Sequence, residues 1–203
     1  MNIQLGSRSK LHIHEKFLGR SKINHLTVKG NYLSNKGGNS VRNGQERLEI
    51  FKRAFDGNNA PLPEIELLNL HTIILRDHAF ENINHLGEFD LNITEAWEVT
   101  VSESAFKNTI FQATFNRISE LQLNERSFSG SKESKIHIMF SYIRNLHRIN
   151  ASLKELKIEN SEIETIKKYS LDVLAIDSLI LRNTKIDLIE SKAITEKVTF
   201  TET

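Results

Sequence analysis

The sequence predicts an all-β repeat solenoid, a parallel β-helix whose coils take up about 23 residues each. The first observation behind this prediction is a recurring phrase: two apolar residues two positions apart, a polar spacer, and then a small residue followed by phenylalanine. The second observation is that the phrase returns at a nearly constant period. The third is a further apolar pair between one phenylalanine and the next phrase. Together they indicate stacked coils that carry two short strands each.

The phrase is clearest between residues 48 and 128. Its four strong copies are Leu48-Glu-Ile50 with Ala54-Phe55, Ile73-Ile-Leu75 with Ala79-Phe80, Val99-Thr-Val101 with Ala105-Phe106, and Leu121-Gln-Leu123 with Ser127-Phe128. Weaker copies, whose apolar pairs begin at Ile143, Ile163 and Ile186, end at Ala151, Leu171 and Ile194. The phrase ends are therefore 25, 26, 22, 23, 20 and 23 residues apart. An amphipathic helix would not hold this period over six steps.

The second apolar pair of each repeat predicts a second strand, because alternation with period two places side chains on opposite faces. The pairs are Leu26/Val28, Leu68/Leu70, Leu91/Ile93, Ile138/Phe140, Leu156/Ile158, Leu179/Leu181 and Val198/Phe200. Equivalent strands of neighbouring coils are expected to pair in parallel, about 4.8 Å apart. Small polar residues between the strands, such as Asn31, Thr94, Ser161 and Thr184, are either hydrogen-bonding turn residues or ordinary polar ones.

We expect residues 1–203 to form a single solenoid domain with one inserted loop. The loop is the Gly-, Asn- and Ser-rich stretch 34–45, which separates the two strands of an early coil; it is either a tolerated insertion or a binding loop. A degenerate coil with Leu11 and Ile13 precedes it. At the C-terminal end, Val198-Thr-Phe200 reads as a first strand without a second. Such an uncapped end predicts a longer array or end-to-end self-association.

Composition narrows the partner classes. The chain has 203 residues, a net charge of +1 and no cysteine, and its sequence pI is about 8.0. Nothing in this balance indicates a nucleic-acid or membrane-surface partner, and no apolar run reaches the length of a membrane span. The N-terminal segment has no uninterrupted apolar core of a secretory signal, so the chain is either intracellular or a mature or incomplete segment. No cofactor is implied.

Few residues suggest chemistry. His12 and His14 would face outward on one strand, as a metal pair requires, but no third ligand is identifiable, so exposed strand histidines are the stronger interpretation. Acidic residues recur after the second strand among basic ones and would suit either a solvated face or a glycoside-cleaving ribbon: Asp77, Glu103, Glu125 and Glu190 with Arg76, Arg126 and Lys192. Trp97 either packs over a corner of its coil or anchors a partner or sugar. The sequence therefore names no catalytic, cofactor-binding or metal-binding residue.

Three segments resemble the strand of a leucine-rich repeat. They are Ile23-x-x-Leu26-x-Val28-x-x-Asn31-x-Leu33, Leu153-x-x-Leu156-x-Ile158-x-x-Ser161-x-Ile163 and Ile176-x-x-Leu179-x-Leu181-x-x-Thr184-x-Ile186. The Ala-Phe phrases resemble the ends of extracellular and BspA-like leucine-rich repeats, and the chain is similar to uncharacterised secreted arthropod repeat proteins. This resemblance implies an extracellular location and a leucine-rich horseshoe with one sheet as the alternative fold.

The sequence departs from the leucine-rich pattern in ways that favour the β-helix. Only Asn31 matches the asparagine ladder of that family, and Val99-Thr-Val101 and Leu121-Gln-Leu123 alternate strictly where a horseshoe has its convex side. For function we expect a non-enzymatic repeat protein that acts as a protein-interaction or structural scaffold, with a protein partner. A carbohydrate-active or glycan-binding β-helix is the alternative.

Overall fold

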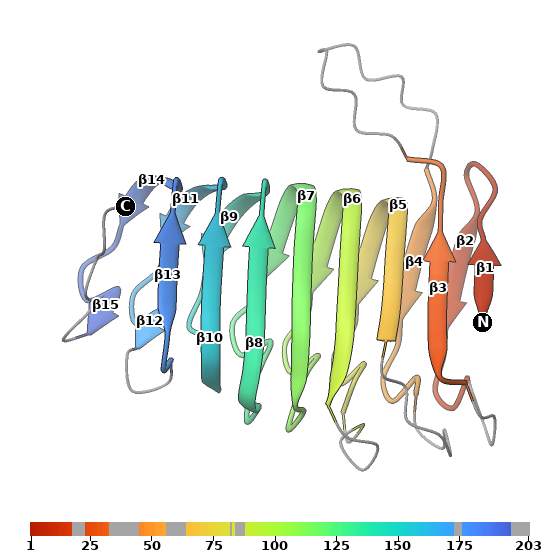
Figure 1. Ribbon diagram of the computed structural model, residues 1–203, viewed down its shortest axis with the longest axis horizontal. Coiled ribbons are helices and arrows are strands. Elements are labelled where there is room, and N and C mark those ends of the chain that lie inside the picture. The colour runs from red at the N-terminus through yellow and green to blue at the C-terminus, as the bar shows by residue number, and fades with distance from the viewer. Residues whose placement is uncertain are drawn as a thin grey trace.

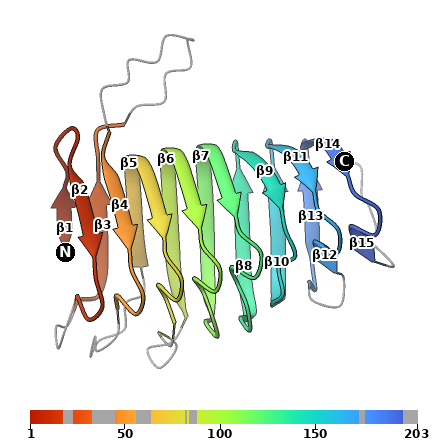
Figure 2. The ribbon, with the colours of Figure 1, turned by 180° about the vertical axis from the view of Figure 1, so that it is seen from behind.

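The protein forms a parallel β-solenoid, as the sequence predicts. The computed structural model describes residues 1–17, 23–32, 45–55, 64–81, 83, 88–172 and 176–195. The coils stack into a rod with one sheet in front and a second behind it (Figures 1 and 2). The coils thus contribute strands to two sheets, in place of the single sheet expected of a leucine-rich horseshoe. All strand pairings in the described residues are parallel.

Two sets of strands build the two sheets. The first sheet contains β1 (Asn2–Gln4), β3 (His25–Lys29), the first parts of β5 (Glu64–Leu75), β6 (Phe89–Val101) and β7 (Phe111–Leu123), then β8 (Lys132–Met139), β10 (Ser152–Glu159) and β13 (Leu179–Arg182). The second contains β2 (Lys10–Ile13), β4 (Arg47–Ile50), the second parts of β5, β6 and β7, then β9 (Tyr142–Leu146), β11 (Glu162–Ile166) and β14 (Lys185–Ile189). The short strands β12 (Leu171–Asp172) and β15 (Ile194–Thr195) pair with each other. They lie where the chain returns from the second sheet to the first, which we call the turn edge.

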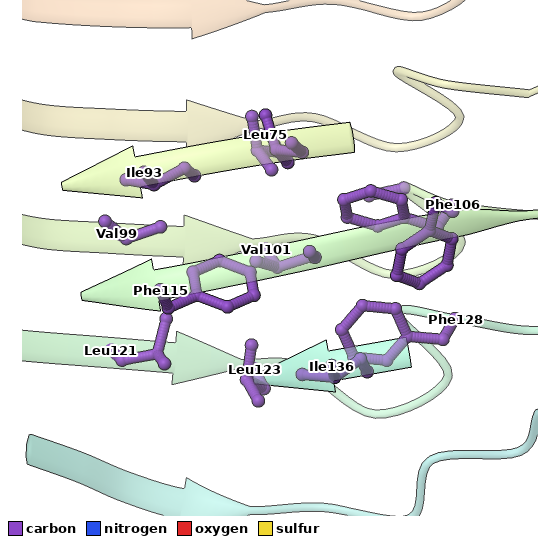
Figure 3. Packing of buried hydrophobic residues seen from close by; sticks show 14 of the residues in the cluster. Leu75, Ile93, Val99, Val101, Phe106, Phe115, Leu121, Leu123, Phe128 and Ile136 are labelled. Carbon is purple, nitrogen blue, oxygen red and sulfur yellow. The ribbon is translucent and has the colours of Figure 1, made fainter. Parts of the chain in front are cut away.

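The core consists of apolar columns that run through the stack. In the second sheet one column links Leu48, Ile73, Val99 and Leu121 in register, and all four are fully buried. In the first sheet Val28, Leu67, Ile93 and Phe115 form the equivalent column. Figure 3 shows side chains of both sheets meeting between them. Because a single coil cannot bury these side chains, each depends on its neighbours in the stack.

Two of the predicted inward pairs lie too far along the chain, by three residues in β5 and by two in β8. The pair in β5 is Ile65 and Leu67, not Leu68 and Leu70, because parallel pairing sets Leu67 beside Val28; Leu70 is buried at the corner that follows. In β8 the pair is Ile136 and Ile138.

Phe140, assigned inward by the sequence, is 55% exposed because the strand ends at Met139 and the chain turns there. In β5 consecutive apolar residues offered two alternation registers, and pairing with β3 decides between them; in β8 the alternation is as predicted, but the strand ends before Phe140. The inward pair of β7, Ala113 and Phe115, was not predicted from the sequence, and neither was the burial of Phe89 and Phe111 in the core.

The small-plus-aromatic phrase is a repeated turn. The residue before the small one has a positive φ in each copy, as at Arg53, His78 and Ser104. The small residue donates its backbone N–H to the carbonyl three positions earlier, as Ala79 does to Arg76 at 3.1 Å. The phenylalanine then enters the core, where Phe55, Phe80, Phe106 and Phe128 stack at centroid distances of 4.8–5.3 Å.

Some predictions fall outside the described residues. The loop at 34–45 does so for all but its last residue, and so does the strand Val198-Thr-Phe200. The last described strands of the two sheets, β13 and β14, each pair with a single described neighbour. Leu179, Leu181 and Ile186 are only partly buried there, and Ile189 is 49% exposed.

Candidate functional site

The two histidines suggested as a metal pair belong to a ring cluster. Ile13 is fully buried between them, so both flank it on the outer side of the coil. The His14 ring stacks on Phe51 at 4.5 Å, and the His12 ring meets the same phenylalanine edge-on at 5.6 Å. Within the described ranges no group of three His, Cys, Asp or Glu side chains is arranged to hold a metal ion.

Beside this cluster lies a carboxylate that the sequence analysis did not single out. Glu49 is 5% exposed and accepts hydrogen bonds from Arg47 at 2.6 Å and from Arg76 at 2.6 and 2.9 Å. Burial would raise the pKa of the Glu49 carboxyl, but the hydrogen bonds from Arg76 and Arg47 outweigh it and hold the pKa below its ordinary value. Glu49 thus ties β4 to the adjacent coil as a carboxylate whose ionised form the two arginines favour.

The proposed acidic ribbon does not converge into a catalytic pair. Arg126 lies 3.9 Å from both Glu103 and Glu125, and all three side chains are exposed. Glu190 accepts hydrogen bonds from the Lys168 backbone N–H and the Lys167 ammonium, which together lower its pKa.

Arg76, which the sequence placed in this ribbon beside Asp77, turns to Glu49 instead. These contacts are what an ion-paired solvated surface shows.

A second carboxylate cluster lies on the first sheet. Glu159, 8% exposed, receives a hydrogen bond from His137 at 2.9 Å and contacts Lys157 at 2.8 Å and Arg182 at 3.6 Å. Its three partners come from three neighbouring strands. The hydrogen bond from Lys157 is the main cause that lowers the pKa of Glu159. Only parallel register, invisible in the sequence, brings these residues together.

The corner between the two sheets changes character along the rod. In β5, β6 and β7 the strand runs continuously around it, whereas in later coils the first strand ends and a separate one begins (Figure 1). In the three continuous strands the buried corner residue is apolar: Leu70, Ala96 or Ile118. One further residue follows it before the second sheet starts. In later coils this further residue is missing, and a hydroxyl residue occupies the corner: Ser141, Ser161 or Thr184.

The hydroxyls satisfy backbone groups that the tighter corner frees. Ser161 Oγ donates to the Glu159 carbonyl at 2.7 Å and accepts the Ser141 N–H at 3.2 Å. Ser141 Oγ in turn accepts the Ile118 N–H at 3.1 Å, and Thr184 donates to the Ile158 carbonyl. This confirms the hydrogen-bonding interpretation for Ser161 and Thr184. Asn31 likewise donates to the Leu5 carbonyl at 2.9 Å.

Shortening of the corner leaves a shallow, open groove along it. The groove has a volume of about 900 Å³. It is lined by Ile118, Ser119, Phe140, Ser141, Tyr142, Asn160, Ser161, Glu162, Leu181, Asn183, Thr184 and Lys185. Asn183 donates its side-chain amide to the Asn160 side-chain carbonyl at 2.7 Å, so the two amides form a short ladder. A hydrogen bond to Glu164 raises the pKa of the Tyr142 phenol, which therefore stays protonated.

Trp97 lies on the same corner, in the continuous strand β6. It is 40% exposed and stacks on His71 of the preceding coil at 6.3 Å, and His71 meets Tyr32 edge-on at 6.0 Å. Parallel register places Trp97 next to Ser119, which lines the groove. Trp97 thus belongs to an aromatic column rather than to the core. Exposed rings and the groove share this corner of the rod.

A second hollow marks the place where the phenylalanine ladder stops. It has a volume of about 270 Å³, and Ile149, Ala151 and Ile176 are among the residues that line it. Ala151, the end of a weaker phrase, does not take the place of a phenylalanine: Ser152 pairs with Lys132, so Ala151 lies beside Ser131, and the hollow lies where this turn is shorter than the preceding one. It is lined on other sides by hydroxyl residues such as Ser131 and Ser170.

Comparisons with known proteins leave the function to be argued from the molecule itself. No protein-family model matches the sequence, and the searches of curated proteins and of solved structures also found no match. The described residues contain no helix that is long and apolar enough to cross a membrane. The fold and the class of protein are therefore those of a parallel β-solenoid.

Proposed function

We propose that the protein is a non-enzymatic repeat scaffold that presents a flat sheet face to a protein partner. The observation that carries this proposal is the regular set of ion pairs that link neighbouring coils on the outer faces. Arg144 contacts Glu120 at 2.5 Å, Lys185 contacts Glu162 at 2.8 Å, and His137 contacts Glu159 at 2.9 Å. Such pairs add little stability, but they hold charged side chains in fixed positions along a rigid stack.

Affinity capture with a face variant tests the scaffold proposal. The side chains of Thr114 and Gln122 alternate with buried neighbours on β7, one on each sheet face, so Thr114→Arg and Gln122→Arg change the faces without touching the core. We expect a partner retained by the native protein to be lost by one of these variants and kept by the other. Failure to retain any partner, together with measurable turnover on a polysaccharide panel, would contradict a non-enzymatic scaffold.

We also propose that the rods associate end to end. The core columns of the two sheets reach both ends of the described stack: Leu181 and Ile3 belong to one column, and Ile186 and Leu11 to another. Stacking β13 and β14 of one copy on β1 and β2 of the next would continue the same columns. Light scattering after size exclusion is expected to show a mass that rises with concentration, and a strict monomer at high concentration would refute this association.

A further inference from the structure

Phe140 occupies its position at a cost to the fold. Its φ is 49°, the left-handed region that bulky side chains avoid, and its ring is 55% exposed. The equivalent corner positions of other coils share this positive φ and hold Asn69, Glu95, Arg117, Asn160 and Asn183. Three of the five are asparagine, which tolerates this conformation best after glycine, and none of the five is aromatic. The exposed ring adds nothing to the core. The positive φ belongs to the corner of each of these coils; what distinguishes Phe140 is a bulky, exposed ring at a position that elsewhere carries a polar side chain, and strained residues of this kind cluster at ligand-binding sites.

The groove around Phe140 combines flat apolar and polar surfaces. The Phe140 ring lines the same groove as the corner residues Ser141 and Ser161 and the amides of Asn160 and Asn183. Each amide uses only part of its hydrogen-bonding capacity in the Asn183–Asn160 contact, since an asparagine side chain offers two donors and two acceptor sites. The groove thus offers a stacking surface beside a row of neutral donors and acceptors.

Charges along this corner cancel in pairs. Lys185 neutralises Glu162 at 2.8 Å, and Arg117 neutralises Glu95 at 3.4 Å. A nucleic acid or an anionic polymer needs a surplus of basic groups, which this corner does not provide. The surface suits an uncharged ligand that has apolar faces and many hydroxyls.

We propose that this corner binds an uncharged polysaccharide strand that lies along the rod, from Trp97 to Asn183. The faces of a sugar ring carry C–H groups that stack on aromatic rings, and its edges carry hydroxyls that suit amides. Neighbouring coils are about 4.8 Å apart, close to the advance per sugar in an extended chain. Trp97 in β6 and Phe140 after β8 are two coils apart, or roughly 10 Å. Successive sugars therefore meet successive coils. This inference goes beyond the scaffold function and stands on a different surface.

Titration with uncharged hexasaccharides tests the proposal. Cellohexaose, laminarihexaose, chitohexaose and xylohexaose are added to the full chain, and binding is followed by calorimetry and by the fluorescence of Trp97, the only tryptophan. We expect at least one hexasaccharide to bind and to change the Trp97 emission. Failure of all four to bind would overturn the proposal.

The key variant is Phe140→Asn, because it removes the ring and relieves the backbone at once. We expect its affinity for the bound hexasaccharide to fall about tenfold, the loss of one stacking contact, while its Tm rises by about 2–4 °C. Tyr169→Asn is the matched control: Tyr169 is also left-handed and 37% exposed, but it lies in a turn outside the groove. It should gain stability and keep native affinity. Unchanged affinity in Phe140→Asn, or equal losses in both variants, would overturn the proposal.

Discussion

The coils that end at Phe55, Phe80, Phe106 and Phe128 and those that follow solve the same packing problem differently. The former fill the turn edge with packed rings, and the three of them that contain β5, β6 and β7 fill the corner with Leu70, Ala96 and Ile118. The later coils place Ala151 and Leu171 at the turn edge and hydroxyls at the corner. Both keep the apolar columns of the two sheets. The strand columns therefore define the solenoid, while the edges are free to vary.

The difference explains where the surface features arise. An apolar corner needs an extra residue to carry the chain around it, whereas Ser161 bonds two backbone groups itself and permits a shorter path. The shorter path opens the corner groove. In the same way, the hollow at the turn edge lies where the turn from Leu146 to Ser152 is shorter than the turn from Leu123 to Lys132. Both hollows lie in or next to the later coils, because the corner and the turn are shorter there.

The largest expected effect breaks the ring ladder. Phe106→Ala should destabilise the protein by about 3–5 kcal/mol, because its fully buried ring contacts Phe80, Phe111 and Phe128. Urea unfolding monitored by circular dichroism measures the change. Phe140→Ala, which removes an exposed ring, serves as the control and should leave stability nearly unchanged. A loss below about 1 kcal/mol in Phe106→Ala would show that the ladder contributes little to the fold.

The next effect concerns the buried carboxylate of the ring-bearing coils. Glu49→Gln should cost about 1.5–3 kcal/mol at neutral pH, toward the lower value because Arg47 and Arg76 are 39% and 44% exposed. Since the folded-state pKa of Glu49 is lowered, its contribution is complete above the unfolded pKa and is lost as pH falls through the folded one.

Unfolding free energies measured from pH 7 down to pH 3 check this pH dependence. The native protein should lose stability on acidification more steeply than Glu49→Gln does. Glu125→Gln, in a well-exposed pair, is the control and should follow the native curve. Parallel curves for the native protein and Glu49→Gln would contradict the assigned role.

The fold was predictable because its signal is periodic. The Ala-Phe phrase and the alternating pairs are properties of each coil, and any in-register stack of such coils buries them. Register within an apolar run was not predictable, because the choice between Leu67 and Leu68 depends on the neighbouring coil. The end of β8 before Phe140 was not predictable either, because it depends on the corner. Single-sequence alternation cannot express that dependence.

The candidate site was predictable only in fragments. Trp97 stood out as the sole tryptophan, and Ser161 and Thr184 as small polar turn residues, but nothing in the sequence linked them to Phe140. Their proximity arises from parallel stacking of segments about one coil apart. The corner is one residue shorter from Met139 to Tyr142 than from Asn116 to Glu120. An alignment of the coils would have revealed this difference in length.

A smaller effect tests the hydroxyl corner directly. Ser161→Ala removes a donor to the Glu159 carbonyl and an acceptor of the buried Ser141 N–H, so it should cost about 1–2 kcal/mol. Ser119→Ala is the control, because Ser119 is an exposed corner residue of the continuous strand β7. It should change stability by less than about 0.5 kcal/mol. Chemical denaturation of both variants measures the difference, and equal values would show that the hydroxyl is not what permits the short corner.

The smallest expected effect extends the apolar filling of the earlier coils into the later ones. Ala151→Leu places a larger side chain in the hollow of about 270 Å³ and should stabilise the protein by about 0.5–1 kcal/mol. Ala105→Leu is the matched control: Ala105 is fully buried beside Phe106, without space for a larger side chain, so the same substitution should destabilise by about 1–3 kcal/mol. Thermal unfolding distinguishes the two by the direction of the Tm shift. Opposite signs would show that the hollow beside Ala151 has room for a larger side chain, whereas destabilisation by both substitutions would mean that the later coils are packed as tightly as the earlier ones.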